Sequence, residues 1–244
     1  MKQFMVLLAV GLLAGRLAHA QKQPCATAGN NNDYLGIQTI RLWPGDAPQA
    51  RGKACEDTPT LTIFEPHRGN GNGSAVVVLP GGAYVNLAAN LEGRQVADWF
   101  TSRGFRAFIL SYRLSSNGYL LPVPLLDARR AIQTVRARAL DYQIDPNRIV
   151  VIGFSAGGHL AALSATQFVP GNPDAEDPID RASSRPDYLV LGYPDRRHLQ
   201  RYIAPVLLQA FQRDGPLRSA SDRVLSRSFR DQRHASDLLV PHLR

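Results

Sequence analysis

The segment GFSAG, residues 153–157, holds a serine between two glycines. The apolar run RIVVIGF leads into it, and GGHLAALSATQF after it has the pattern of a helix. A serine on a sharp strand-to-helix turn exposes its hydroxyl, which can attack a carbonyl carbon. Glycines are required on both sides because larger side chains would collide with the neighbouring strand and helix. We therefore expect Ser155 to be a nucleophile; the alternative is an ordinary turn in which it only caps the helix.

A second glycine turn, LPGGAY at residues 79–84, directly follows the apolar run AVVVLP. The negative oxygen of a tetrahedral intermediate needs two or three N–H donors aimed at one point, and glycine lets the backbone turn its amides that way. We expect the amides of Gly82, Ala83 and Ala156 to form this oxyanion hole. The alternative is a tight turn without a ligand, but its place after a buried strand and ahead of GFSAG favours the first interpretation.

A serine nucleophile also needs a base that accepts its proton. His159 lies one turn into the helix after Ser155. That helix carries the ring away from the serine hydroxyl, so we expect a structural role for His159. The sequence contains no metal-binding or nucleotide-binding motif, and no cofactor is implied.

Strands alternating with helices are expected to position these residues. Residues 36–42 and 60–66 alternate apolar and polar side chains and are expected to pair antiparallel at the edge of the sheet. Helices are predicted for residues 91–103 and 125–142. Four further apolar runs predict buried strands at residues 75–80, 105–112, 148–154 and 188–194. The predicted fold class is α/β, a mostly parallel sheet with an antiparallel N-terminal edge and helices on both faces.

A resemblance to a known family is carried by LPGGAYVNLAANLEGRQVADWF, ILSYRL, LLDARRAIQTVRARALDYQIDPNRIVVIGFSAGGHLAA and YLVLGYP. Over residues 36–194 the chain resembles the α/β-hydrolase esterases related to hormone-sensitive lipase and to the feruloyl and acetyl-xylan (BD-FAE-like) esterases. Many of these are exported bacterial enzymes that remove acyl groups from plant polysaccharides. The resemblance implies an α/β-hydrolase fold with the nucleophile and amides already named. Pro80 replaces a histidine of the lipase-like motif and Ala83 a third glycine, and neither change removes a needed amide.

The acid and the base should follow the nucleophile, in the order Ser, then Asp or Glu, then His. Residues 195–244 contain a single glycine and no aspartate after a buried strand, so both residues stay unknown. The candidates are Asp195, Asp214, Asp222, Asp231, Asp237, His198, His234 and His242.

An out-of-frame origin is one explanation for this change of pattern. One codon choice for RDQRHASDLLVPH, read one nucleotide later, gives Val-Thr-Asn-Asp-Thr-Pro-Ala-Thr-Phe-Trp-Ser-His. That peptide resembles the segment leading into the acid-bearing strand of the family. We therefore expect a hydrolase truncated or frameshifted after about Pro194, with its C-terminal strands missing and residues 195–244 an aberrant basic tail.

The N-terminus has the layout of a secretory signal peptide over residues 1–20, with a positive start, an apolar core and a small-x-small triplet. An uncleaved anchor is the alternative. We expect an exported protein, periplasmic or secreted, with a flexible arm over residues 21–35. In an oxidising compartment Cys25 and Cys55 can form a disulfide, and whether they do is left open.

Composition favours one domain, because 244 residues with 44% hydrophobic residues can bury one sizeable core. We assign that core to residues 36–194. The net charge of +8 raises the question of nucleic-acid binding. Ten arginines lie in residues 195–244, interleaved with aspartates and not aligned on one helix face, so no nucleic-acid partner is expected.

The expected function is that of an exported serine hydrolase that cleaves carboxylic esters, such as acyl groups on carbohydrate, through an acyl-enzyme on Ser155. The expected partner is a small-molecule or carbohydrate ester, with no membrane contact after signal cleavage; the oligomeric state stays open. One alternative is a non-catalytic exported remnant or binding protein, and another is a peptidase of the same fold. A histidine within hydrogen-bond reach of Ser155 is required for the enzyme and not for the binding protein. Comparing the hydrolysis of ester and peptide substrates distinguishes an esterase from a peptidase.

Overall fold

The computed structural model describes residues 37–67 and 69–194. They form a six-stranded sheet in the order β1-β2-β4-β3-β5-β6. The strands are β1 (Ile37–Arg41), β2 (Thr60–Phe64), β3 (Ala75–Leu79), β4 (Arg106–Ser111), β5 (Ile149–Phe154) and β6 (Tyr188–Gly192). The helices are α1 (Gln95–Thr101), α2 (Val123–Ala137) and α3 (Ala156–Thr166), with a π-helical turn η3 (Ala89–Arg94) before α1 and three short 3-10 turns, Cys55–Asp57, Ser115–Asn117 and Pro178–Arg181.

The strand directions bring three loops to one edge of the sheet. β1 pairs antiparallel with β2, as predicted for the sheet edge, and β2 pairs antiparallel with β4. β3 runs parallel to both β4 and β5, and β5 runs parallel to β6. In this register Leu79 lies opposite Gly153, and Phe154 lies opposite Gly192. The loops that follow β3, β5 and β6 therefore meet at the carboxyl edge, where α/β sheets place their sites.

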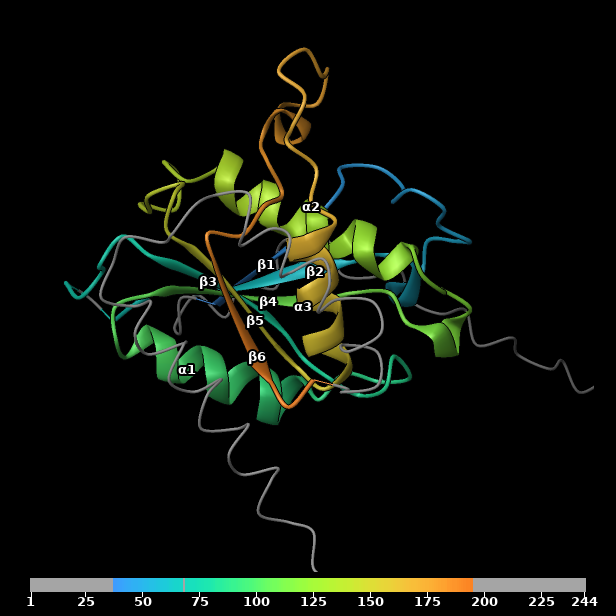
Figure 1. Cartoon of the computed structure of the whole chain (residues 1–244), viewed down its shortest axis with the longest axis horizontal. Helices are drawn as coiled ribbons and strands as arrows, with labels where there is room; N and C mark the ends of the chain where they lie inside the picture. Colours follow the sequence, from blue (N-terminus) through green and yellow to red (C-terminus); the bar gives the residue numbers. More distant parts are fainter. Residues whose placement is uncertain (1–36, 68, 195–244) are drawn as a thin grey trace, which may run out of the picture.

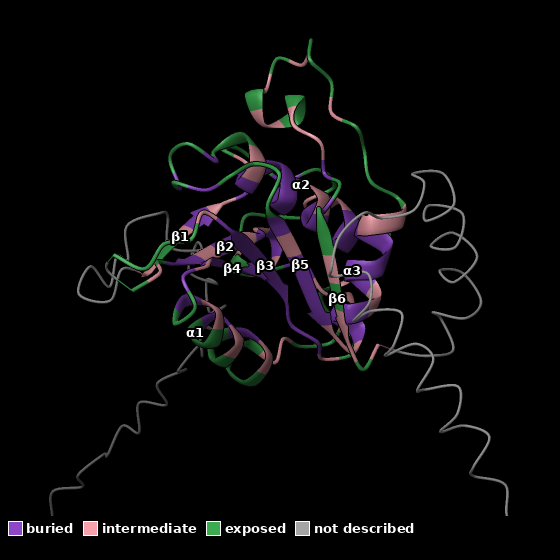
Figure 2. Ribbon diagram, turned by 60° about the vertical axis from the view of Figure 1, so that its left-hand side comes forward, coloured by how far each residue is buried: buried purple, intermediate pink, exposed green. Residues whose placement is uncertain are grey.

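Helices cover both faces of the sheet, which explains the uninterrupted apolar run AVVVL of β3. Val76 and Val78 share a core cluster with Ala97 of α1, and Val77 belongs to the opposite cluster with Ile132 of α2. Figure 1 shows α1 on one side of the sheet and α2 and α3 on the other. In Figure 2 the central strands are buried and the outer side of α1 is exposed. The α/β prediction is confirmed.

Two helix boundaries differ from the predictions. The predicted helix at residues 91–103 is observed as η3 continued by α1. The predicted helix at residues 125–142 begins at Val123 and ends at Ala137, because the chain must turn back toward β5. In that turn the amide of Tyr142 donates to the carbonyl of Arg138. Tyr142 is buried although it lies beyond the helix, so the apolar pattern in the sequence runs past the observed helix end.

The prediction that β6 is a buried strand is wrong for the described part of the chain. Tyr188 is 55% exposed and Val190 is 44% exposed. Within residues 37–67 and 69–194, β6 pairs only with β5, and α3 packs on one of its faces. β6 resembles β3 in its apolar composition. Its burial, however, depends on which strands and helices pack against it, and its own sequence does not reveal them.

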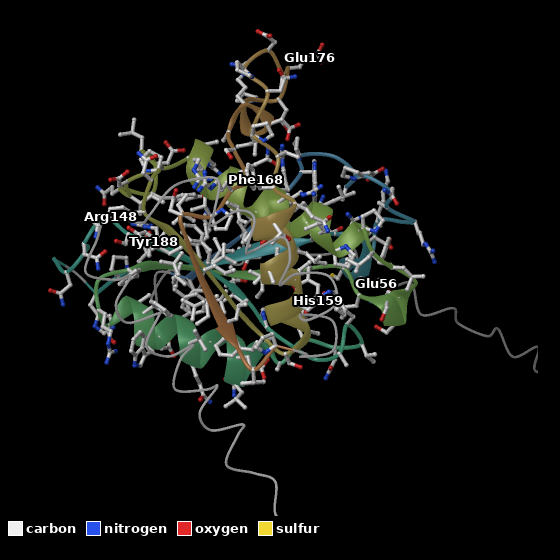
Figure 3. All side chains as sticks on the ribbon, viewed as in Figure 1. Glu56, Arg148, His159, Phe168, Glu176 and Tyr188 are labelled. Atoms are coloured by element: carbon white, nitrogen blue, oxygen red, sulfur yellow. The ribbon has the colours of Figure 1, made fainter. Side chains whose placement is uncertain are left out.

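Several sequence predictions concern residues outside those described. They include the signal peptide at residues 1–20, the arm at 21–35, Cys25 and the tail at 195–244. Within the described ranges, no helix has the length and apolar character needed to cross a bilayer. The segment between α3 and β6 extends away from the sheet, and Figure 3 shows Glu176 near its tip.

Candidate active site

Ser155 occupies a strained turn between β5 and α3. Its φ of 49° and ψ of −116° lie where non-glycine residues are uncommon. The Ser155 amide donates a 3.0 Å hydrogen bond to the carbonyl of Gly192, at the end of β6. Strain of this kind costs about 1–3 kcal/mol and persists where surrounding structure enforces it, which is common at functional sites. The local sequence therefore forms the sharp strand-to-helix turn that GFSAG predicted.

The two glycines of this turn have no room for a side chain. A Cβ on Gly153 would lie 2.2 Å from the carbonyl oxygen of Gly157. A Cβ on Gly157 would lie 2.1 Å from the carbonyl oxygen of Leu79, in the neighbouring strand β3. Both oxygens belong to the backbone of hydrogen-bonded elements, so shifting them would disrupt α3 or β3.

Replacing Gly157 by alanine is expected to destabilise the protein. The added methyl group overlaps the β3 backbone, and overpacking of this kind costs roughly 1–3 kcal/mol. Gly158 is the matched control, because its Cβ would meet its nearest neighbour, the Gly153 carbonyl oxygen, at 3.1 Å. Urea unfolding of both variants, followed by circular dichroism, measures the difference. Equal midpoints for Gly157→Ala and Gly158→Ala would contradict the close packing of the turn against β3.

The loop after β3 lies directly beside Ser155. A Cβ on Gly81 would be 3.0 Å from the Cβ of Ser155. The next three residues all have positive φ, 130° at Gly82, 56° at Ala83 and 61° at Tyr84. Glycine favours that conformation, whereas a residue with a Cβ adopts it only at a cost. The order and spacing of the two glycine turns thus bring the predicted residues together.

The amides predicted to form the oxyanion hole have no acceptor within the described structure. No carbonyl or side chain of residues 37–67 and 69–194 accepts a hydrogen bond from the amides of Gly82 and Ala83. Ala156 is the first residue of α3, and the amide of a first helical residue has no acceptor inside its helix. These N–H groups therefore have no hydrogen-bond acceptor among the described residues, as an empty oxyanion hole requires.

Three ring side chains hold the loop after β3 in place. The hydroxyl of Tyr84 and Nδ1 of His159 are 3.0 Å apart, and the two rings pack edge to face. The Tyr112 hydroxyl donates to the carbonyl of Pro80 at 2.7 Å, and its ring packs against that of Tyr84. Burial raises the pKa of Tyr84 and Tyr112, so both phenols stay protonated at neutral pH. His159, on the first turn of α3 (Figure 3), is bound to the loop, in line with a structural role.

Sequence reasoning missed three residues of this arrangement. Tyr112, Tyr193 and Glu92 lie within the segments that carry the family resemblance, but the sequence assigned no role to any of them. In the structure the amide of Gly81 donates to Oε2 of Glu92 at 2.6 Å, and the hydroxyl of Tyr193 donates to Oε1. Only the fold brings these residues together, because Glu92 and Tyr193 are 101 positions apart.

All candidates for the acid and the base lie outside the described residues. These are Asp195, Asp214, Asp222, Asp231, Asp237, His198, His234 and His242. Besides His159, the described part of the chain contains His67, which precedes β3 and so belongs to the amino edge of that strand, opposite Ser155. In the same part of the chain, no cluster of three His, Cys, Asp or Glu side chains is arranged to hold a metal ion.

One cavity is remote from these residues. It has a volume of about 460 Å³ and lies between α2 and the segment 169–172, beside Trp43. It shares no lining residue with the site. A smaller cleft of about 90 Å³ includes Tyr112 and Leu87, so it borders the aromatic support of the loop.

Known proteins resemble the chain in the region that builds this site. An acetylxylan esterase of Xylanibacter ruminicola is 34% identical over 134 residues, which cover 55% of this chain and 25% of that protein. An acetyl ester-xyloside bifunctional hydrolase from Caldicellulosiruptor lactoaceticus has a structure that matches with a TM-score of 0.58 and 41% identity, over 64% of this chain and 56% of that one. A thermophilic esterase from Thermogutta terrifontis matches with a TM-score of 0.52 and 27% identity, over 65% and 53%.

The chain thus spans a quarter of the acetylxylan esterase and just over half of the two hydrolases of known structure. Its mixed sheet with helices on both faces is the α/β-hydrolase fold. The BD-FAE family model matches residues 61–182, which is half of the sequence and includes both glycine turns. The chain belongs to the BD-FAE family.

Proposed function

We propose that this protein is a serine esterase that removes short acyl groups from carbohydrate, with Ser155 as its nucleophile. The observation that carries the proposal is the strained turn of Ser155 directly beside Gly81, the residue that leads into the amides of Gly82 and Ala83. Acyl transfer requires a hydroxyl and N–H donors aimed at one point, and the amides of Gly82 and Ala83 have no acceptor among the described residues. The names of the relatives, an acetylxylan esterase and an acetyl ester-xyloside hydrolase, support acetyl as the acyl group and a xylose polymer as the alcohol.

The proposed reaction has two steps. The Ser155 oxygen attacks the ester carbonyl as a base takes its proton, and the amides stabilise the negative oxygen of the tetrahedral intermediate. The carbohydrate hydroxyl leaves with a proton, and the acyl group stays on the serine. Water then attacks the acyl-enzyme and releases the acid. The base stays unassigned among the candidates His198, His234 and His242. Export is assigned to the leader-like residues 1–20, because polymeric substrates lie outside the cell.

Release of acetate from acetylated xylo-oligosaccharides by the full chain tests this proposal. We expect acetate release and hydrolysis of p-nitrophenyl acetate, with no cleavage of peptide p-nitroanilides. The same oligosaccharides stripped of acetate provide the blank. Cleavage of peptides in preference to esters would replace the proposal with a peptidase. Absence of hydrolysis of every ester, together with binding of the oligosaccharide, would replace it with a binding protein.

A further inference from the structure

One carboxylate connects the two loops on either side of Ser155. Glu92, on η3, accepts a 2.6 Å hydrogen bond from the amide of Gly81, in the loop after β3. Its other oxygen accepts a hydrogen bond from the hydroxyl of Tyr193, in the loop after β6. Both loops contact the nucleophile, because a Cβ on Gly81 would be 3.0 Å from the Cβ of Ser155 and the Ser155 amide bonds to Gly192.

The hydrogen bonds of the loop show why this carboxylate matters. The carbonyls of Pro80, Gly81 and Gly82 accept from the Tyr112 hydroxyl, the amide of Ala88 and the amides of Val85 and Asn86. Among the described atoms, Oε2 of Glu92 is what the Gly81 amide donates to. Glu92 therefore fixes the peptide plane that directly precedes the amides of Gly82 and Ala83.

Backbone strain in both loops indicates that they need such a restraint. Tyr193 has a φ of 32°, and Ala83 and Tyr84 have φ values of 56° and 61°. Each non-glycine residue in such a conformation costs about 1–3 kcal/mol unless its surroundings enforce it. Glu92 holds one loop through the backbone of Gly81 and the other through the side chain of Tyr193.

We propose that Glu92 is a positioning residue that aims the amides of Gly82 and Ala83 at the oxygen attached to the reacting carbon, by binding the Gly81 amide and the Tyr193 hydroxyl together. This inference rests on the proposed function for its catalytic consequence. It predicts that the loop needs an acceptor at this position and does not need the negative charge. Glutamine keeps an acceptor oxygen for Gly81 and can turn its amide toward the Tyr193 oxygen, whereas alanine leaves both donors without a partner.

The test compares Glu92→Ala and Glu92→Gln with Leu91→Ala in the full chain. Leu91 is the matched control, because it lies on the same π-helical turn and its side chain is 65% exposed. We expect Glu92→Ala to lower kcat on p-nitrophenyl acetate about 10²-fold, as misplaced catalytic donors do, with KM unchanged. Glu92→Gln is expected to retain most of the activity, and Leu91→Ala all of it. Equal losses in the alanine and glutamine variants, or a change confined to KM, would overturn the inference.

Hydrogen exchange separates this inference from the proposed function. The Gly81 amide is expected to exchange faster in Glu92→Ala than in the wild type, and at the wild-type rate in Glu92→Gln. If the wild type hydrolyses no ester, the proposed function fails and the exchange rates alone decide whether Glu92 holds the loop. Unchanged exchange at Gly81 in Glu92→Ala would overturn the inference. If the alanine variant does not fold, Tyr193→Phe removes the second donor and leaves Glu92 bound to Gly81 alone. Faster exchange at Gly81 is expected in that variant, because the carboxylate is then held from one side only, and an unchanged rate would overturn the joint role of the two donors.

Discussion

Replacing Ser155 by alanine is expected to remove nearly all hydrolysis of p-nitrophenyl acetate. The nucleophilic oxygen disappears, while the amides of Gly82 and Ala83 and the packing of the turn stay in place. In serine hydrolases loss of the nucleophile costs up to about 10⁶-fold in kcat, and roughly 10³-fold catalysis over water remains from the oxyanion hole and binding. We therefore expect kcat/KM to fall by at least about 10³-fold.

Ser102→Ala is the control for this variant. Ser102 is an exposed serine after α1 whose hydroxyl donates to the carbonyl of Trp99, so its loss leaves the site intact. Stopped assays at equal protein concentration, with unfolding curves for each variant, compare the two. A large loss in Ser155→Ala would also show that a base acts on this serine and would direct the search to His198, His234 and His242. Wild-type rates in Ser155→Ala would exclude Ser155 as the nucleophile.

Replacing Asp127 by alanine is expected to lower the free energy of unfolding by about 3–5 kcal/mol. Asp127, on α2, and Arg113, after β4, are 0% and 2% exposed. The Asp127 carboxylate accepts from the Arg113 guanidinium at 2.6 Å and from the Arg113 amide at 2.9 Å. Without the carboxylate, a buried positive charge loses its counter-charge, which is far costlier than the loss of an exposed ion pair.

Two further variants make this prediction specific. Asp141→Ala breaks an exposed pair with Arg138, whose side chains are 61% and 44% exposed, and is expected to cost at most about 1 kcal/mol. The double variant Arg113→Met/Asp127→Leu removes both charges and is expected to recover part of the lost stability. Urea unfolding midpoints measure all three. If Asp127→Ala is no more destabilising than Asp141→Ala, the buried pair does not hold α2 to the loop after β4.

Local patterns predicted the part of the fold whose causes are local. Runs such as AVVVL placed the central strands within one or two residues, because a parallel strand covered on both faces must be apolar throughout. The turn at Ser155 was predictable for a similar reason. A Cβ added to Gly153 or Gly157 would lie about 2 Å from a backbone oxygen, so glycine is required at both positions.

Other features depend on partners far away in the sequence. The exposure of β6 reflects its single strand neighbour in the described sheet, which its own apolar residues do not reveal. Glu92 lies in a predicted helix, and only the fold brings it to Gly81 and Tyr193. The acid and the base stay unknown, because residues 195–244 lack the strand and loop patterns that would single out one pair.

The central claim is that an acyl group passes through Ser155, and trapping that intermediate tests it most directly. The full chain is mixed with p-nitrophenyl acetate, quenched in acid during turnover, digested and analysed by mass spectrometry. We predict that the peptide containing Ser155 gains the mass of one acetyl group, and that the corresponding peptide of Ser155→Ala does not. Hydrolysis of the ester with no acetyl group on that peptide, or with acetyl found only at another residue, would contradict the claim.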